Sequence, residues 1–317
     1  MNQNIVIFCL VVIVSIILFL IFDKIVNFNP FKNSVKISET FVSKALGKEI
    51  ELNKNTSKKN PLQIIKKKKV AQPKEEPIKD LVFTSAGDKT NFHNLWIGKK
   101  QKYDVMVVYY GVNDLKYNTY AKKADYILKR KGSKFQNFHY IYENYPEIIN
   151  KYDRFFILDD DIIFNVEDIN KMFELSKKYN FKICGPTFKD SPECKISHIV
   201  TKTENKNQFR YTNFIEVNVP LFNREALDKL MKYYDPVLIG WGIDYLFIWA
   251  NGIDSKNSYA LVDSVICINP QDSKKGGNRE LNNIPDVDNR ALVYAKFAKK
   301  LGIPKHIRGK TLKTVKL

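Results

Sequence analysis

The sequence has little cysteine and little histidine, with four residues of each among 317. Four cysteines are too few for a disulfide-stabilised scaffold, and no Cys/His spacing matches a zinc site, so a structural zinc module is excluded. The histidines also show no pairing, which argues against a two-metal phosphoester hydrolase, because such enzymes draw several ligands from separate segments. The four are His93, His139, His198 and His306.

Apolar residues, by contrast, are plentiful: hydrophobic residues make up 44% of the chain and aromatic residues 13%. This content is ample for a packed core and excludes wholesale disorder. The length suits one large domain of catalytic size or two small ones. No internal repeat is visible.

The positive charge is concentrated in two segments. With 52 basic and 34 acidic residues the formal charge is +18, which would suggest a nucleic-acid partner if it were spread over a domain. Seven lysines between residues 54 and 69, and seven Lys or Arg residues between 299 and 316, stand in stretches without an acid. These two segments hold 14 of the 18 excess charges, so we expect no nucleic-acid partner.

One long apolar run begins near the N-terminus. From Ile5 to Phe22 every residue except Ser15 is apolar, and 18 helical residues would span roughly 27 Å, close to the thickness of a bilayer core. A cleaved signal peptide is the alternative, but the run lacks a basic region before it and a small-residue cleavage site after it. We therefore expect residues 1–22 to form a transmembrane signal-anchor.

The side of the membrane on which the rest of the chain lies stays open. Three lysines follow the run and favour a cytoplasmic domain, whereas large trailing domains often translocate regardless of charge. A luminal domain would give meaning to the glycosylation sequon at Asn55, and would permit a loop-closing disulfide between Cys184 and Cys194; free thiols are expected otherwise. The three lysines are Lys24, Lys32 and Lys36.

Composition divides the remainder into a stem, a domain and a tail. Residues 23–78 are polar, rich in Lys and Asn and interrupted by prolines, so we expect a basic flexible stem. From residue 79 to 298, short apolar runs alternate with helical stretches, and residues 299–317 form a basic C-terminal tail. Apolar runs predict strands at 81–83, 103–110, 138–142, 154–158 and 260–270. Helices are expected at 116–131, 145–152, 166–179 and 245–250.

This alternation predicts an α/β domain with a mostly parallel, Rossmann-like sheet flanked by helices. In such sheets ligands bind beyond the carboxyl ends of the strands, and the most unusual residues of the sequence lie at those positions. Asp159, Asp160 and Asp161 directly follow the apolar strand 154–158. Three adjacent carboxylates beside apolar sequence repel one another and need a compensating cation.

A divalent ion supplies that compensation economically. Residues two apart in an extended chain point to the same side, so Asp159 and Asp161 could face one Mg²⁺ or Mn²⁺ while Asp160 faces away. The alternative is a helix N-cap, because Asp161 precedes the expected helix 166–179. A cap needs one aspartate rather than three, so we favour a metal site.

A second motif follows the apolar residues 237–239: the segment 240–244 reads Gly-Trp-Gly-Ile-Asp. Two glycines around a tryptophan permit a tight turn, and Asp244 at the head of a helix is placed to accept a proton or hydrogen bonds at a pocket wall. In the purely structural interpretation, Asp244 caps the helix and Trp241 belongs to the core. Asp263, inside a later apolar strand, could be part of the site or a carboxylate paired to a basic neighbour.

Taken in order, these segments resemble the family catalogued as domain of unknown function 707, whose members are regarded as glycosyltransferase-like single-pass membrane proteins with a GT-A type nucleotide-sugar fold. The resemblance covers about residues 80–275. It is carried by the segments 84–88, 103–111, 131–134, 156–161, 211–217 with 220–222, 240–244 and 262–264.

The resemblance implies roles for these residues. Asp159 and Asp161 would bridge a metal to the donor diphosphate, with Asp160 beside them, and Asp244 or Glu216 would be the acceptor-side carboxylate. Where the family often has a histidine that can ligate the metal, this chain has Asn269, whose carbonyl oxygen binds a hard cation more weakly unless His198 or another group substitutes. The nucleotide pocket would include Thr84, Ser85, Gly87 and Asp88.

Lys134, with Lys131, could add positive charge at the diphosphate, or the two could be an ordinary surface pair. The sequence thus predicts a glycosyltransferase that uses Mn²⁺ or Mg²⁺ to move a sugar from a nucleotide-sugar to a hydroxyl of a glycan, lipid or protein at a membrane of the secretory pathway, in the Golgi or endoplasmic reticulum. Two alternatives remain: an inactive membrane-tethered binding or adaptor protein with the same fold, and a metal-dependent phosphoester hydrolase.

Overall fold

The structure is a computed structural model that describes residues 63–64, 77–253, 255–272, 280–285 and 287–317. The chain divides into two compact units, residues 1–59 and 60–317, and the described residues belong to the second. The expected anchor (1–22), almost all of the expected stem (23–78) and the sequon lie outside the described residues. Among the residues that are described, no helix is long and apolar enough to cross a membrane.

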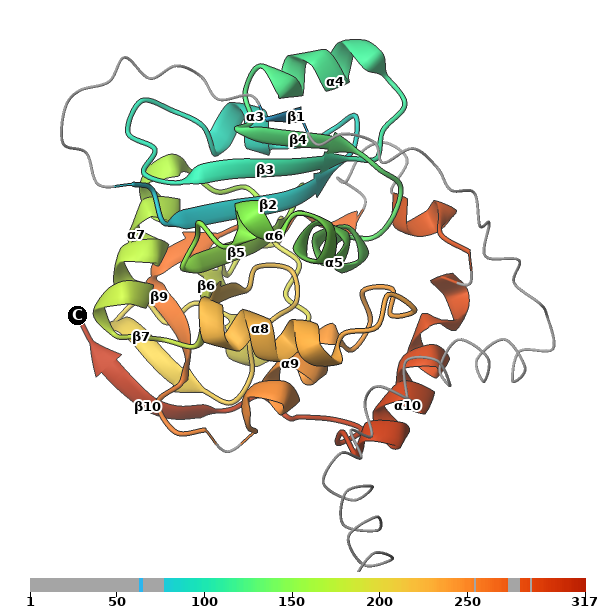
Figure 1. The fold of residues 1–317 in the computed structure, drawn as a ribbon. Helices are drawn as coiled ribbons and strands as arrows, with labels where there is room; N and C mark the ends of the chain where they lie inside the picture. Colours follow the sequence, from blue (N-terminus) through green and yellow to red (C-terminus); the bar gives the residue numbers. More distant parts are fainter. Residues whose placement is uncertain (1–62, 65–76, 254, 273–279, 286) are drawn as a thin grey trace, which may run out of the picture. The chain divides into compact units, whose positions relative to one another are not determined.

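The centre of the described unit is one sheet of ten strands, which Figure 1 shows between two groups of helices. Its order is β1-β4-β3-β2-β5-β8-β6-β9-β7-β10. The strands are β1 (Gln63–Ile64), β2 (Asp80–Ala86), β3 (Asp104–Tyr109), β4 (Tyr126–Lys129), β5 (Arg154–Asp159), β6 (Ile183–Phe188), β7 (Asn207–Thr212), β8 (Leu221–Asn223), β9 (Tyr259–Cys267) and β10 (Thr311–Lys316).

The α/β class predicted from the sequence is confirmed, but the sheet is mixed rather than mostly parallel in its pairing. Strands β4, β3, β2 and β5 pair in parallel, and so do β6 and β9. The short strand β8 runs antiparallel between β5 and β6, and β7 runs antiparallel to both β9 and β10. The strands from β2 to β6, together with β9, therefore still direct their carboxyl ends to one edge of the sheet.

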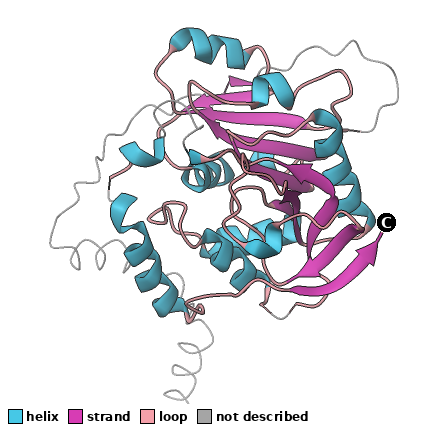
Figure 2. Cartoon of the chain, turned by 180° about the vertical axis from the view of Figure 1, so that it is seen from behind, coloured by secondary structure: helices cyan, strands magenta, loops and turns pink. Residues whose placement is uncertain are grey.

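Helices cover both faces, and alternate residues of the strands supply the two cores. In β2, Leu81 and Phe83 join the core under α5, α6, α8 and α9, whereas Val82 and Ala86 join the core under α3, α4 and α7. Figure 2 shows the same sheet from behind. The helices are α3 (Phe92–Leu95), α4 (Asp114–Ala121), α5 (Lys134–Asn144), α6 (Pro146–Ile149), α7 (Val166–Lys178), α8 (Arg224–Tyr233), α9 (Ile243–Asn251) and α10 (Arg290–Leu301). The described residues also form short 3₁₀ helices at η1 (Ile199–Thr201), η3 (Glu280–Asn283) and η4 (Val287–Asn289).

Two expected elements differ in type. Residues 138–142, expected as a strand, belong to helix α5, which buries Phe135, Phe138 and Ile141 at a three-residue spacing that suits a helix face. The expected helix 116–131 ends as α4 at Ala121, and residues 126–129 form β4 instead. The apolar residues of β4 pair with β3, and this pairing overrides the helical pattern.

The ends of the sheet include residues from segments that we expected to lie outside the domain. β1, within the expected stem, pairs antiparallel with β4. Residues 299–317, expected as a basic tail, contain the last turn of α10 and the strand β10, which pairs along its length with β7. The C-terminal segment therefore contributes an edge strand of the sheet.

Candidate functional site

A cavity of about 500 Å³ opens at the carboxyl edge of the sheet, within the size range of small-molecule sites. It is lined by residues at or just after the ends of β2, β3, β5 and β9, namely Ser85, Tyr110, Asp159 and Asn269. The order in which strands are added to the sheet changes direction at β2, because β3 and β4 lie on one side of it and β5 lies on the other. Ligands of open α/β sheets bind at such a switch point, so the cavity stands where the fold favours a ligand.

The acidic turn lies at this switch point because β5 ends there. The residues of β5 between its ends are buried, and the backbone N–H of Asp159 donates to Asn218 O at 3.0 Å, which joins the strand end to the segment before β8. The chain then turns, with Ile162 N donating to Asp159 O at 3.3 Å. All three aspartates of the turn line the cavity.

Asp160 is held by the neighbouring strand ends. Its Oδ2 accepts hydrogen bonds from Gly87 N at 2.9 Å and from the hydroxyl of Tyr110 at 3.2 Å. Burial, followed by the negative charge of Asp161, raises the pKa of Asp160 to about 7. Asp160 thus ties the acidic turn to the ends of β2 and β3.

Asp159 is paired with a buried lysine. Lys134 Nζ lies 2.8 Å from Asp159 Oδ1, and the lysine side chain is only 10% exposed, so it is not the surface lysine that one interpretation of the sequence expected. The same ammonium donates to Ile157 O at 3.2 Å, Val217 O at 2.7 Å and Asn218 O at 3.2 Å. Burial lowers the pKa of Lys134, and the aspartates oppose that shift. The three N–H bonds of Lys134 therefore already have partners within the protein.

Two further carboxylates line the same cavity. Glu216 and Asp244 are both buried, with exposed fractions of 5% and 7%. Burial, and then the charge of Asp244, raises the pKa of Glu216 to about 8. Burial raises the pKa of Asp244 to about 6, against the hydrogen bond that its Oδ1 accepts from Tyr245 N at 2.9 Å. The structure thus brings both predicted acceptor-side candidates to one cavity.

The Gly-Trp-Gly turn positions Asp244 without using it as a cap. Gly242 is the N-cap of α9, with φ of +76°, and Asp244 follows in the first helical turn. A Cβ at Gly242 would lie 2.4 Å from the ring of Tyr294, so the position requires glycine for space as well as for backbone conformation. Trp241 is 51% exposed and lines the cavity, so it does not belong to the core.

The predicted metal ligands carry oxygen atoms of the type that Mg²⁺ and Mn²⁺ prefer. Asp159, Asp161 and Asn269 offer hard oxygen atoms along one cavity. Asn269 is 1% exposed and its Nδ2 donates to Lys195 O at 3.4 Å. In the described part of the chain, no group of three or more His, Cys, Asp or Glu residues could hold a metal ion. Two carboxylates still suit Mg²⁺, which is held by one or two carboxylates together with substrate phosphates.

His198, named as a substitute ligand, also lines the cavity. Its ring lies 4.4 Å, centroid to centroid, from that of Phe214, and burial lowers the pKa of the imidazole. A neutral imidazole is the form that ligates metals, so His198 keeps that option.

Three predicted nucleotide-pocket residues do not line the cavity. Thr84 is fully buried in β2, and Gly87 contributes its N–H to Asp160. The carboxylate of Asp88 accepts a hydrogen bond from the hydroxyl of Tyr109, and its carbonyl accepts one from Tyr120 at 3.0 Å. These residues support the strand ends behind the cavity, and only Ser85 of that loop reaches it.

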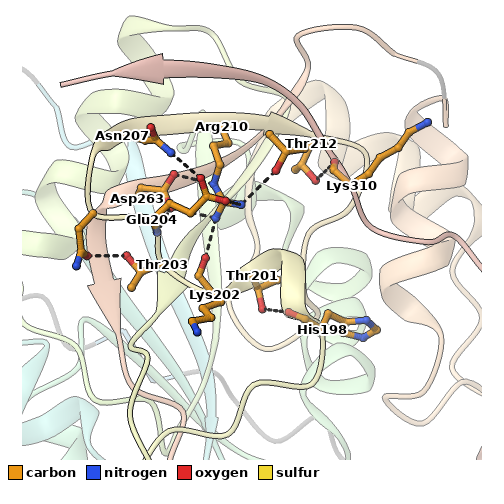
Figure 3. A network of polar contacts seen from close by, with 12 residues as sticks. His198, Thr201, Lys202, Thr203, Glu204, Asn207, Arg210, Thr212, Asp263 and Lys310 are labelled. Atoms are coloured by element: carbon orange, nitrogen blue, oxygen red, sulfur yellow. Dashed lines mark hydrogen bonds and ion pairs between the residues drawn. The ribbon is translucent and has the colours of Figure 1, made fainter.

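Asp263 lies in a separate structural network, which Figure 3 shows. Arg210 binds both carboxylate oxygens of Asp263, with Nε to Oδ2 at 2.8 Å and Nη2 to Oδ1 at 3.0 Å. Arg210 also contacts Glu204 at 2.9 Å and donates to Thr311 at 3.2 Å. Asp263 is therefore the carboxylate of a buried ion pair that joins β9, β7 and β10, and not a residue of the cavity.

The cysteines of the described residues are free. Cys184 lies in β6, and Cys194 and Cys267 are likewise buried thiols. The disulfide between Cys184 and Cys194 that a luminal domain would have permitted is absent from the structure.

Several cavity residues escaped the sequence analysis. Tyr110, Asn218, Lys195 and Arg290 all line the cavity. Tyr110 closes the strand 103–110 that the sequence predicted, and a polar residue at such a strand end was a usable signal. Arg290, at the start of α10, comes from a segment with no motif, and only tertiary structure brings it to the site.

No curated protein matches the chain. Among solved structures, residues 1–349 of TarS from S. aureus are 9% identical, with a TM-score of 0.46, covering 70% of this chain and 65% of that one. The same TarS fragment in complex with UDP-GlcNAc is 10% identical, with a TM-score of 0.48, covering 70% of this chain and 66% of that one. The chain thus spans slightly less than two thirds of the fragments it matches.

The chain was also compared with models of protein families, and one of them matches. The model described as "Protein of unknown function (DUF707)" matches residues 39–213. The match includes the acidic turn and Lys134, and it ends before Glu216 and the Gly-Trp-Gly turn. Because the matched residues are more than half of the chain, the resemblance seen in the sequence is confirmed, and the protein belongs to the DUF707 family.

Proposed function

We propose that the protein is a metal-dependent glycosyltransferase that moves a sugar from a nucleotide-sugar to an acceptor hydroxyl. One observation carries the proposal: a single cavity at the switch point of the sheet combines the acidic turn 159–161 with the two buried carboxylates Glu216 and Asp244. The turn suits a cation and the diphosphate of a donor, and the second pair of carboxylates suits the proton chemistry of an acceptor.

Asp159 and Asp161 would hold Mg²⁺ or Mn²⁺, with the carbonyl oxygen of Asn269 as a further ligand. Bound there, the ion would neutralise the charge that develops on the departing nucleoside diphosphate. Asp160 and Lys134, which line the same cavity, support this arrangement. Asp160 fixes the turn through Gly87 and Tyr110, and Lys134 holds one oxygen of Asp159.

The two acceptor-side carboxylates divide the acid–base work by their pKa values. Near pH 7, Asp244, with a pKa of about 6, is mostly ionised, whereas Glu216, with a pKa of about 8, is mostly protonated. In an inverting transfer Asp244 takes the proton of the acceptor hydroxyl while the oxygen of that hydroxyl bonds to the anomeric carbon. The bond from that carbon to the diphosphate breaks, and the leaving group keeps the electron pair. Glu216 donates a hydrogen bond to substrate.

A donor panel tests the proposal against its two alternatives. The full-length protein is incubated with nucleotide-sugars and Mn²⁺, and nucleoside diphosphate release is measured before and after chelation. We expect release that stops on chelation and that Asp161→Ala abolishes. An adaptor protein would release nothing, and a phosphoester hydrolase would cleave simple phosphoesters instead.

A matched variant separates the metal role from folding. Asp161→Ala removes one of three mutually repelling carboxylates from a turn, so we expect the fold to persist. Asp168→Ala, in the first turn of α7, removes an aspartate that does not line the cavity and should leave release unchanged. Parent-like Mn²⁺ and nucleotide binding by Asp161→Ala would refute the metal assignment.

A further inference from the structure

The cavity carries a half-exposed tryptophan. The chain has three tryptophans, of which Trp96 is fully buried and Trp249 packs against Tyr233 with 5.0 Å between ring centroids. Trp241 alone lines the cavity, and its side chain is 51% exposed. A large aromatic ring left open to solvent on a concave surface is a typical ligand contact.

The backbone under this ring is tightly constrained. Gly240 and Gly242 adopt φ of +72° and +76°, and Trp241 N donates to Ile239 O at 2.8 Å. Gly242 is wedged against Tyr294, and its carbonyl accepts the hydrogen bond of Leu246 N at 3.0 Å in α9. The backbone that carries the indole is therefore held at the head of a helix, so little backbone ordering remains when a ligand binds.

The wall of the same cavity includes a buried oxygen atom that can accept a further hydrogen bond. Among the described residues, Oε2 of Glu216 has no hydrogen-bond partner, although the side chain is about nineteen-twentieths buried. Asp244 lies in the same cavity, and the one nearby lysine that faces Glu216, Lys195, is paired with Asp272. A ligand with several hydroxyl groups satisfies such oxygens without adding negative charge.

We propose that the acceptor is a neutral carbohydrate whose C–H face stacks on Trp241 while its hydroxyls bond to Glu216 and Asp244. The positive edges of C–H bonds suit the negative face of an indole. The negative charge of Asp244 and of the acidic turn 159–161, which line the same cavity, repels an anionic acceptor and disfavours acidic saccharides on this wall. A nucleobase is disfavoured as the ligand of Trp241, because the proposed site of the donor's phosphates is the acidic turn. There Tyr110, beside Asp160, offers an aromatic ring on which the base of the donor could stack. The role of the saccharide as acceptor rests on the proposed function, whereas the saccharide-binding site does not depend on it.

Tryptophan fluorescence tests the site directly. The full-length protein, in a detergent without a sugar head group, is titrated with maltotriose, cellotriose and N,N′-diacetylchitobiose. We expect a saturable change in emission with at least one of them, retained in Trp249→Phe because that ring is packed away from the cavity. Trigalacturonate, an acidic trisaccharide, should bind at least about tenfold more weakly.

Calorimetry then measures the contribution of the ring. Trp241→Ala should weaken binding of the same neutral saccharide at least about tenfold, the scale for loss of a large aromatic anchor, and Trp241→Phe should restore part of it. Parent-like affinity in Trp241→Ala overturns the proposal, as does a panel in which no neutral saccharide binds. It is also overturned if uridine, rather than any saccharide, produces the Trp241 response.

Failure of this inference is distinguishable from failure of the proposed function. Metal-dependent release of nucleoside diphosphate with no saccharide binding would leave the transferase standing and remove the carbohydrate acceptor. Saccharide binding at Trp241 without any such release would leave a carbohydrate-binding site in a protein that is not a nucleotide-sugar transferase.

Discussion

Lys134 shows how one buried side chain can hold the geometry of a site through several protein contacts at once. Its ammonium lies among Asp159 and three backbone carbonyls, at 2.7 to 3.2 Å. Replacing it with an apolar residue would leave a partly buried carboxylate and three carbonyls without their donor. Such a loss is far more costly than the loss of an exposed lysine.

We therefore predict that Lys134→Met lowers the free energy of unfolding by about 3–5 kcal/mol, the scale for breaking a buried ion pair. Lys131→Met is the matched control, because Lys131 is an exposed lysine of the same loop and should change stability by about 0.5 kcal/mol or less. Urea unfolding of both variants measures the difference. Equal stability of the two would show that the contacts of Lys134 contribute nothing net.

The carboxylate pair predicts a bell-shaped rate profile. Transfer should rise with pH as Asp244 ionises near pH 6 and fall as Glu216 ionises near pH 8. Glu216→Gln keeps a hydrogen-bond donor and should remove the falling limb. Asp244→Asn should lower the transfer rate by roughly 10² or more, with donor affinity nearly unchanged. If Asp244→Asn transfers at the parental rate, Glu216 becomes the candidate base.

The same pair makes stability depend on pH in a defined direction. The pKa of Glu216 is raised from 4.5 to about 8, so the native state binds the proton more tightly than the unfolded chain does. The stabilisation from this group is fully present below about pH 4.5 and is lost as pH rises through 8. We expect the difference in melting temperature between Glu216→Gln and the parent to favour the variant more at pH 9 than at pH 5. A constant difference across that range would contradict the assignment.

At the scale of elements, the contacts of the Arg210–Asp263 pair join three strands. The third strand is β10 of the C-terminal segment, which contributes Thr311. Arg210 in β7 binds Asp263 in β9 and Thr311 in β10, and the ionic side chains are 2% and 0% exposed. Figure 3 shows that this network also includes Glu204 and Asn207. The last strand is therefore joined to the sheet by side-chain contacts as well as by its backbone ladder.

We predict that Arg210→Met lowers the free energy of unfolding by about 3–5 kcal/mol, because Asp263 would be left buried without its cation. Lys202→Met breaks an exposed pair with Asp190 and should cost about 1 kcal/mol or less. The double variant Arg210→Met/Asp263→Leu should recover part of the loss, since no buried charge is left unpaired and Glu204 is half exposed. Additive losses in the double variant would contradict an energetic coupling between the two residues.

The elements also show which parts of the fold were readable from sequence. Buried strands such as β3 and β5 were predicted because apolar runs ended in turns. Helix α5 was missed, although Ser133 and Gln136 have the spacing of a capping box and Ser133 N donates to Gln136 Oε1 at 2.9 Å. β8, only three residues long, carries no periodic signal, and its antiparallel insertion between β5 and β6 could not be derived from local sequence.

Across the whole described unit, the location of the site was more predictable than its composition. Polar residues at the carboxyl ends of predicted strands pointed to the edge of the sheet where the cavity opens, and Ser85, Asp159, Asp244 and Asn269 line that cavity. Which neighbours each would have depended on contacts between distant segments. The burial of Lys134 by the 217–218 backbone is of this kind, because nothing local distinguishes it from a surface lysine.

The N-terminal boundary of the described domain gives the last prediction. A fragment of residues 79–317 keeps β2 to β10 but lacks β1, which pairs with Tyr126 and Ile127 of β4. Without β1, one edge of the sheet presents unpaired backbone N–H and C=O groups, a surface prone to association. We expect both 60–317 and 79–317 to unfold cooperatively, and 79–317 alone to self-associate at high concentration, as measured by light scattering after gel filtration. Equal association of the two fragments would show that the pairing of β1 does not protect the edge of β4. Failure of both to fold would place the domain boundary before residue 60.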